Sequence, residues 1–246
     1  GGLIITIKNR DPDVVLEAIE NYKVELLPTS PTFLNLILIS ESYKKYNTNS
    51  LKVISYGTEP MPEYTLKALN KIFPQVKILQ TYGLIELGVL RSKSEKNDSL
   101  WVKIGGEGYK TRIIDGILQI KAESAMLGYL NAPDPFTEDG WFITGDEVLQ
   151  KGDYVKILGR RSEIINVGGE KVFPIEVESV INELDFVSDV EIYAEKNPIL
   201  GNIVCAKVKI DNQSDIDDIE VKIKSYCRSK LEFFKIPIKL KLVDQD

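Results

Sequence analysis

The sequence predicts an α/β body followed by a small α+β domain, and three observations lead to this fold class. Short apolar runs alternate with helical patterns over the first hundred residues, which is typical of a mostly parallel sheet covered by helices. From residue 101 to 160, short strands between glycine and aspartate turns predict a β-rich, barrel-like subdomain. The pattern after Arg160 predicts a compact α+β unit. We therefore expect parts at residues 1–100, 101–160 and 161–246, the first two belonging to one larger domain.

Prolines mark where the helices of the first part begin. Asp11-Pro12, Ser30-Pro31 and Met61-Pro62 each place a proline in or near a first helical turn, where its missing N–H costs nothing. Ligands of such sheets bind at the carboxyl ends of the strands. The predicted elements, in chain order, are a strand at 3–7, a helix at 12–22, a strand at 24–27, a helix after Pro31, a strand at 51–55, a helix after Pro62 and a strand at 76–80.

Two turns that contain glycine separate strands in the later parts. Asp115-Gly116 between apolar runs predicts a hairpin, and Gly168-Gly169 predicts a second turn between two strands. A helix follows, with four apolar residues on one face. Strands at 190–194 and 203–210, an acidic loop at 211–218 and a helix at 216–231 complete the part. The four residues of that helix face are Val177, Val180, Ile181 and Leu184.

Composition excludes several classes of function. The 246 residues are 43% hydrophobic, enough for more than one core. The net charge is −6 with both signs mixed along the chain, so we expect no nucleic-acid partner. The sequence contains no histidine, which rules out a Ser-His-Asp triad, a Cys-His pair and histidine metal sites.

The cysteines and the apolar runs bear on location. Cys205 and Cys227 lack metal-site spacing, and Cys205 lies in an apolar run, so we expect buried thiols in a reducing cytoplasm. No apolar run approaches the roughly 20 residues of a membrane span, and the first residues lack the basic start of a signal peptide. We expect a soluble, cytoplasmic protein.

The segment at 141–178 is the most informative about function. It contains Trp141-Phe-Ile-Thr144-Gly145-Asp146, which places a carboxylate at the end of an aromatic strand. One carboxylate can accept both hydroxyls of a ribose. The segment continues with Gly159-Arg160-Arg161-Ser162-Glu163, Gly168-Gly169 and Pro174-Ile-Glu176-Val-Glu178, in which a glycine turn feeds a helix.

This segment resembles the hinge region of the adenylate-forming (AMP-binding) enzymes, the superfamily of acyl-CoA synthetases, acyl-AMP ligases, firefly luciferase and peptide-synthetase adenylation domains. The resemblance covers nearly the whole chain. It implies that Asp146 and Arg160 bind the ribose, and that a hinge near Ser162 turns a carboxyl-terminal lid between two poses. Most members have an aspartate at the place of Ser162. Gly168 and Gly169 would lie beside the pantetheine tunnel in the second pose.

Simpler interpretations stay open for each of these residues. Asp146 could be a turn acid, Arg160 a surface cation, and the glycine pair only a hairpin turn. Glu176 and Glu178 could simply favour a helix N-terminus.

Two further motifs follow predicted strands. Gln80-Thr81-Tyr82-Gly83-Leu84-Ile85-Glu86 is similar to the family's Tyr-Gly-x-Thr-Glu motif, which implies that Tyr82 and Gly83 lie at the adenine and that Glu86 ligates Mg²⁺. Ile85 replaces a threonine whose hydroxyl would contact phosphate, and isoleucine cannot donate that hydrogen bond. A plain turn is the alternative.

The segment Ser55-Tyr56-Gly57-Thr58-Glu59-Pro60 is similar to the family's loop along the adenine pocket. Glycine permits close backbone approach to a flat ring. This resemblance implies nucleotide contacts from Tyr56, Gly57 and Thr58. An ordinary turn before the next helix is the alternative.

We assign no catalytic residue, because the family's Ser/Thr/Gly-rich phosphate loop and its late lysine do not occur in the sequence. Lys239 and Lys241 lie on the strand that precedes that lysine. The resemblance therefore implies the carboxyl-terminal part of a longer enzyme, whose amino-terminal half would be a partner of this chain.

The implied function is ATP-dependent activation of a carboxylic acid to an acyl-adenylate, with transfer to the thiol of CoA or of a carrier protein. ATP or AMP, Mg²⁺ and CoA are the implied cofactors. The acid would bind among residues 28–38, 56–58 and 79–84, whose apolar character favours an aryl or fatty acyl group. The alternative is a non-catalytic nucleotide-binding or structural fragment.

Overall fold

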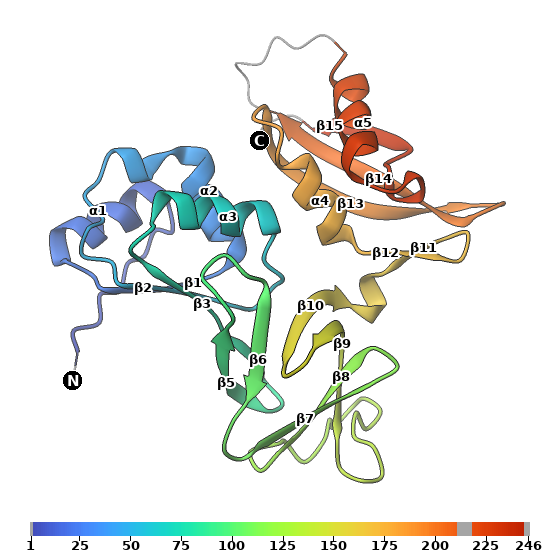
Figure 1. The fold of residues 1–246 in the computed structure, drawn as a ribbon, viewed down its shortest axis with the longest axis horizontal. Coiled ribbons are helices and arrows are strands. Elements are labelled where there is room, and N and C mark those ends of the chain that lie inside the picture. Colours follow the sequence, from blue (N-terminus) through green and yellow to red (C-terminus); the bar gives the residue numbers. More distant parts are fainter. Residues whose placement is uncertain (1, 211–217, 244–246) are drawn as a thin grey trace. The chain divides into compact units, whose positions relative to one another are not determined.

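The computed structural model describes residues 2–210 and 218–243. The chain forms two compact units, Gly1–Ile157 and Leu158–Asp246 (Figure 1). The boundary falls three residues before the one that the sequence predicts at 160. The predicted acidic loop at 211–218 lies almost wholly outside the described residues.

The first part of the first unit is a three-stranded parallel sheet of order β1-β2-β3 with three helices. The side chain of Asp11 accepts the Asp13 N–H at 2.9 Å, and Ser30 accepts the Phe33 N–H at 3.2 Å, so two of the three proline-marked helix starts have a side-chain cap. At the third, Pro62 is itself the N-cap of α3 and makes no such bond. The apolar faces of the three helices pack on the sheet in one core. The elements are α1 (Pro12–Tyr22), β1 (Leu26–Thr29), α2 (Pro31–Ser40), β2 (Val53–Tyr56), α3 (Glu63–Ile72) and β3 (Lys77–Gln80).

The predicted strand at residues 3–7 is wrong. These residues have no regular structure, and the side chains of Leu3 and Ile4 are each 84% exposed. A strand requires a partner for its backbone groups, and no described strand pairs with this segment.

The seven strands from Tyr82 to Arg160 form an open sheet of order β4-β5-β6-β10-β9-β8-β7, and the last of them along the chain, β10, continues past the end of the first unit. It starts at Tyr82, earlier than the predicted residue 101, and it does not close into a barrel among the described strands. The predicted hairpin turn is confirmed, since Asp115 and Gly116 both have positive φ, 50° and 78°. The strands are β4 (Tyr82–Leu84), β5 (Gly88–Ser94), β6 (Trp101–Gly105), β7 (Tyr109–Ile114), β8 (Ile117–Ala122), β9 (Phe142–Lys151) and β10 (Tyr154–Arg160).

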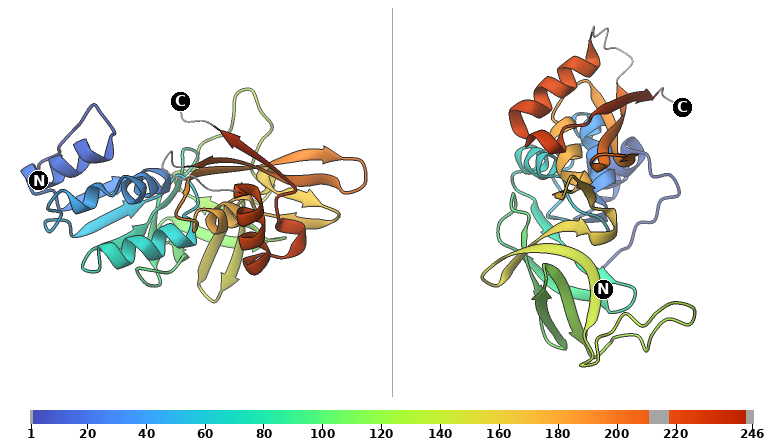
Figure 2. Two further views of the ribbon diagram at one scale, coloured as in Figure 1. Left: turned by 90° about the horizontal axis from the view of Figure 1, so that it is seen from above. Right: turned by 90° about the vertical axis from the view of Figure 1, so that its right-hand side faces the viewer.

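The second unit is a five-stranded sheet with two helices on one face (Figure 2). Cys205 and Cys227 are fully buried, as predicted, and burial raises the pKa of the Cys227 thiol to about 11. No helix in the described part of the chain has the length and apolar character to cross a membrane. The elements are β11 (Ile165–Val167), β12 (Glu170–Val172), α4 (Pro174–Ile181), β13 (Val187–Asn197), β14 (Gly201–Ile210), α5 (Ile219–Lys230) and β15 (Lys239–Val243).

Candidate functional site

The carboxyl ends of β2 and β3 bring two of the predicted motifs together. These strands are parallel neighbours in which Tyr56 pairs with Gln80, so residues 57–60 and 81–86 leave the sheet at the same edge. Thr81 joins the two loops, because its N–H and its hydroxyl both donate to the Tyr56 carbonyl, at 2.7 and 2.9 Å.

Gly57 lies where the two loops touch. A Cβ atom at this position would lie 2.4 Å from Thr81 Oγ1 and 3.0 Å from the Thr81 carbonyl oxygen, so a side chain does not fit. Thr58 follows in the left-handed region, with φ of 75°, a strained conformation for a β-branched residue. Glu59 Oε1 accepts the Thr32 N–H at 2.8 Å and thereby ties the loop to the start of α2.

The side chain of Tyr56 belongs to the core and not to a binding surface. It is 1% exposed, and its hydroxyl donates to Gln80 Oε1 at 3.4 Å. Burial raises the pKa of the Tyr56 phenol well above its ordinary value. Only the backbone of Tyr56 remains for the predicted nucleotide contact.

Tyr82 and Asp146 meet although 64 residues separate them. The Tyr82 hydroxyl donates to Asp146 Oδ2, and both residues are almost fully buried, at 7% and 6% exposure. Asp146 also donates its N–H to Thr144 Oγ1 at 3.0 Å, and the Thr144 hydroxyl donates to the Leu118 carbonyl at 2.8 Å. Tyr82, the first residue of β4, therefore donates to the Asp146 carboxylate, and Thr144 on the same strand as Asp146, β9, fixes the backbone of Asp146.

Gly83 has a structural explanation within the sheet. A Cβ atom there would lie 2.9 Å from the Cα of Val89 on the paired strand β5. The close approach of β4 and β5 is enough to require glycine at this position.

Glu86 follows β4 and contacts a distant loop. The Tyr129 hydroxyl donates to Glu86 Oε1, and the Met126 N–H donates to the Glu86 carbonyl at 2.8 Å. Ile85, at the position of the family's threonine, is fully exposed to solvent. The described residues contain no group of three or more histidine, cysteine or acidic side chains suited to a metal ion. Glu86 would therefore act as a single carboxylate ligand, with water or a bound phosphate supplying the other oxygens around the cation.

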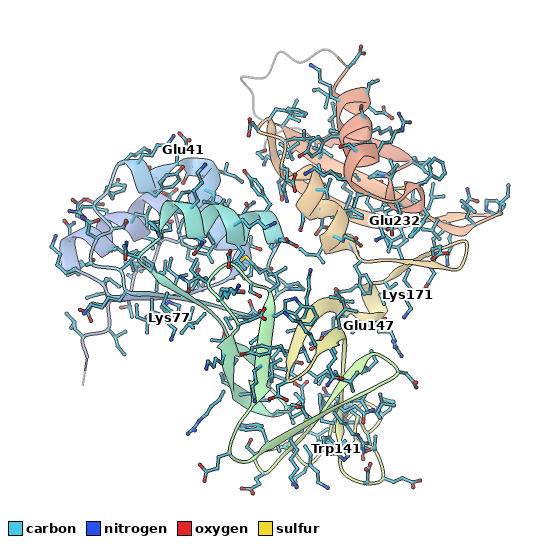
Figure 3. The ribbon with its side chains drawn as sticks, viewed as in Figure 1. Glu41, Lys77, Trp141, Glu147, Lys171 and Glu232 are labelled. Atoms are coloured by element: carbon cyan, nitrogen blue, oxygen red, sulfur yellow. The ribbon has the colours of Figure 1, made fainter. Side chains whose placement is uncertain are left out.

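A cation and an aromatic ring anchor the segment that leads into β9. Arg112 donates to both carboxylate oxygens of Asp139, at 2.7 and 3.2 Å, and lies 4.4 Å from the ring centroid of Trp141, which is labelled in Figure 3. The hydrogen bond from Arg112 lowers the pKa of Asp139 to about 2. This anchor stabilises the start of the strand that carries Asp146.

The remaining predicted residues lie in the second unit. Arg160 is the last residue of β10, and Ser162 lies in the short helix Arg161–Glu163 that follows it. Gly168 and Gly169 form the turn between β11 and β12, with φ of 59° and 96°, and the Gly168 N–H donates to the Leu200 carbonyl at 2.9 Å. Their roles at a ribose, a hinge and a pantetheine tunnel stay predictions.

Glu176 and Glu178 have structural roles in the second unit. Lys235 Nζ lies 2.7 Å from Glu176 Oε1, and Glu178 Oε1 accepts the Ile192 N–H at 3.0 Å. Burial raises the pKa of the Glu178 carboxyl. These contacts connect α4 to β13 and to the segment before β15, so both residues do more than favour a helix start.

Sequence reasoning missed Tyr129 as a partner of Glu86. No local pattern links Tyr129 to a residue 43 positions earlier in the chain. A tyrosine in a loop rich in glycine and proline was the one available signal.

Family models and curated relatives point to the same family of enzymes. A model described as AMP-binding enzyme matches residues 1–112, and one described as AMP-binding enzyme C-terminal domain matches residues 176–246. The chain is 27% identical to 4-coumarate–CoA ligase 1 of Arabidopsis thaliana, covering 96% of the chain and 46% of the relative. It is 30% identical to acyl-CoA synthetase 7 of Caenorhabditis elegans, covering 92% and 45%.

A solved structure agrees in fold. The ATP-bound MatB from Rhodopseudomonas palustris superimposes with a TM-score of 0.77 and 26% identity, over 96% of this chain and 50% of that one. The chain spans about half the length of the curated relatives it matches.

Proposed function

The chain belongs to the AMP-binding enzyme family, and from this premise we propose that it is part of a ligase that activates a carboxylic acid with ATP. The product would be an acyl-adenylate, from which the acyl group passes to a thiol of CoA or a carrier protein. The names of the relatives, a 4-coumarate–CoA ligase and an acyl-CoA synthetase, support an acid and CoA as substrates. The ATP-bound relative supports ATP as the nucleotide.

The hydrogen bond between Tyr82 and Asp146 carries this proposal. Tyr82 follows the carboxyl end of β3, the place where an open parallel sheet binds its ligands, and the bond brings to it the Asp146 carboxylate of β9, a strand of the same seven-stranded sheet as β4. A carboxylate has two oxygens and about four acceptor positions, so Asp146 can accept from Tyr82 and from ribose hydroxyls together. Gly57, against Thr81, keeps the neighbouring loop free of a side chain.

Each residue then has a distinct task. Asp146 binds the ribose, and Tyr82 orients the Asp146 carboxylate beside the adenine. Glu86 offers a carboxylate oxygen to Mg²⁺, a hard cation whose coordination the nucleotide phosphates would complete. When bound, ATP supplies the adenylyl group that the acid receives. Arg160 is proposed as a second ribose ligand, and Gly168 and Gly169 as part of the thiol-transfer surface.

The buried, unpaired cysteines support the proposal of a reducing, cytoplasmic location. The strands β1, β2 and β3 run parallel, so the residues that follow each of them lie at one edge of the sheet, and this supports an acid pocket among residues 28–38, 56–58 and 79–84. An aryl or fatty acyl acid is the proposed substrate class, because α2 has a strongly apolar sequence.

The test is nucleotide binding by the purified chain: titration calorimetry measures the dissociation constants of AMP and of 2′-deoxy-AMP, and the two are compared. We expect Asp146→Asn to weaken AMP binding by about 10-fold to 100-fold, because hydrogen bonds to a charged group contribute about 1.5 to 3 kcal/mol. The unmodified chain should bind AMP more tightly than 2′-deoxy-AMP, and this preference should be smaller in Asp146→Asn. Asp153→Asn is the matched control, since Asp153 is an exposed acid of the same unit that pairs with Lys103.

An unchanged dissociation constant for Asp146→Asn would show that the ribose binds elsewhere. Pyrophosphate exchange with a panel of aryl and fatty acids then tests turnover. Exchange would support the ligase. AMP binding without exchange would favour a nucleotide-binding part that does not react by itself.

A further inference from the structure

The segment that carries Glu86 is held against a loop 40 residues further along the chain. Ser124 Oγ donates to the Leu87 carbonyl at 2.7 Å, and the Met126 N–H donates to the Glu86 carbonyl at 2.8 Å. Tyr129 makes the third contact, from its hydroxyl to Glu86 Oε1. Leu87 itself is fully buried, which fixes the backbone beside Glu86.

The third contact differs in kind from the first two. Ser124 and Met126 hold backbone carbonyls, so they determine where the Cα of Glu86 lies. They leave the direction of its side chain open, because a glutamate has three rotatable bonds and Glu86 is only half-buried. The Tyr129 hydroxyl acts on the carboxylate itself and selects one direction for it.

We propose that Tyr129 is a positioning residue that orients the Glu86 carboxylate for a divalent cation. The inference rests on the proposed function, in which Glu86 is a cation ligand. A ligating carboxylate is ordinarily held by a hydrogen-bond donor behind it, and loss of that donor lowers metal affinity. Tyrosine suits the task, because its rigid ring has few rotatable bonds and its hydroxyl donates to one oxygen while the carboxylate keeps further acceptor positions.

The test separates the cation from the nucleotide. Mn²⁺ replaces Mg²⁺ as a paramagnetic probe, and its affinity is measured by electron paramagnetic resonance in the presence of α,β-methylene-ATP. Tyr129→Phe removes one oxygen atom, and we expect it to weaken Mn²⁺ binding about tenfold, the lower end of the range for such partners. Affinity for AMP without metal should stay within about twofold, because that ligand does not use the carboxylate of Glu86.

Two matched variants remove a tyrosine hydroxyl elsewhere. Tyr226→Phe breaks the same kind of contact, to Glu183 in the second unit, at 2.5 Å. Tyr109→Phe removes a hydroxyl that lies 3.3 Å from the Leu87 carbonyl, next to Glu86 but without contact to its carboxylate. Both should leave Mn²⁺ affinity within about twofold of the unmodified chain.

Glu86→Gln distinguishes failure of the inference from failure of the proposed function. If Glu86→Gln weakens Mn²⁺ binding but Tyr129→Phe does not, the positioning role is refuted and the cation site stands. If Tyr129→Phe weakens metal-free AMP binding as much as Mn²⁺ binding, its role is structural and the inference is again refuted. If Glu86→Gln leaves Mn²⁺ binding unchanged, Glu86 is no ligand, so its proposed role and the positioning role of Tyr129 both fall, whereas the rest of the proposed function still depends on the Asp146→Asn result. Support requires that Tyr129→Phe adds no further loss in the Glu86→Gln background.

Discussion

Substitution of Gly57 by alanine tests the contact between the two strand-end loops. The new Cβ atom would lie 2.4 Å from Thr81 Oγ1 and 3.0 Å from the Thr81 carbonyl oxygen, and the first separation is shorter than any tolerated contact. Overpacking of this kind costs about 1 to 3 kcal/mol. Alanine restricts the unfolded chain and returns about 0.4 to 1 kcal/mol where its backbone conformation is allowed. We expect a net loss of about 1 to 2 kcal/mol in the free energy of unfolding.

Removal of the opposing hydroxyl gives the matching measurement. Thr81→Ala alone should cost about 1 kcal/mol, because it removes the 2.9 Å hydrogen bond from Thr81 to the Tyr56 carbonyl. In the double variant the 2.4 Å contact no longer exists. The combined loss should therefore be about 1 kcal/mol smaller than the sum of the two single losses.

Urea denaturation followed by tryptophan fluorescence measures these effects. Trp101 and Trp141 both lie in the first unit and are the only tryptophans of the chain, so the signal reports the unit that contains Gly57. Gly2→Ala is the control, since no atom lies within 4 Å of a Cβ atom placed there. Unchanged or increased stability of Gly57→Ala, or strictly additive losses in the double variant, would refute the close packing of the two loops.

Two further predictions concern titration. The folded-state pKa of Asp139, about 2, lies below its ordinary value of 3.8, so its contribution to stability is present above pH 3.8 and is lost as the pH falls through 2. Asp139→Asn should flatten the pH dependence of the tryptophan-monitored unfolding midpoint between pH 4 and 2, and an unaltered dependence would contradict the pairing with Arg112. For the thiols, Cys227 has a pKa of about 11 and both cysteines are fully buried, so neither Cys205 nor Cys227 should react with Ellman's reagent at pH 8 until the chain is denatured. Rapid reaction of the native chain would show that the second unit opens readily.

Local sequence chemistry predicted most elements of the fold. A proline after a capping residue starts α1 and α2, and α1 begins and ends at the residues that the pattern predicted. Asp115-Gly116 and Gly168-Gly169 form turns because their backbones can adopt positive φ, a property of the residues themselves. The strand predicted at 3–7 failed because a strand depends on a partner that no local pattern can supply.

The candidate site divides in the same way. The sequence alone identified the family and named Asp146, Tyr82 and Glu86, since each stands in a motif of recognisable spacing. Only the tertiary structure decided what these residues contact: Tyr82 meets Asp146 and Tyr129 meets Glu86 because sheets and loops bring distant segments together. Sheet packing likewise buried the side chain of Tyr56. A motif contains only residues that are close in the sequence. The hydrogen bonds from Tyr129 to Glu86 and from Tyr82 to Asp146 join residues 43 and 64 positions apart, so they form only when the backbone has folded.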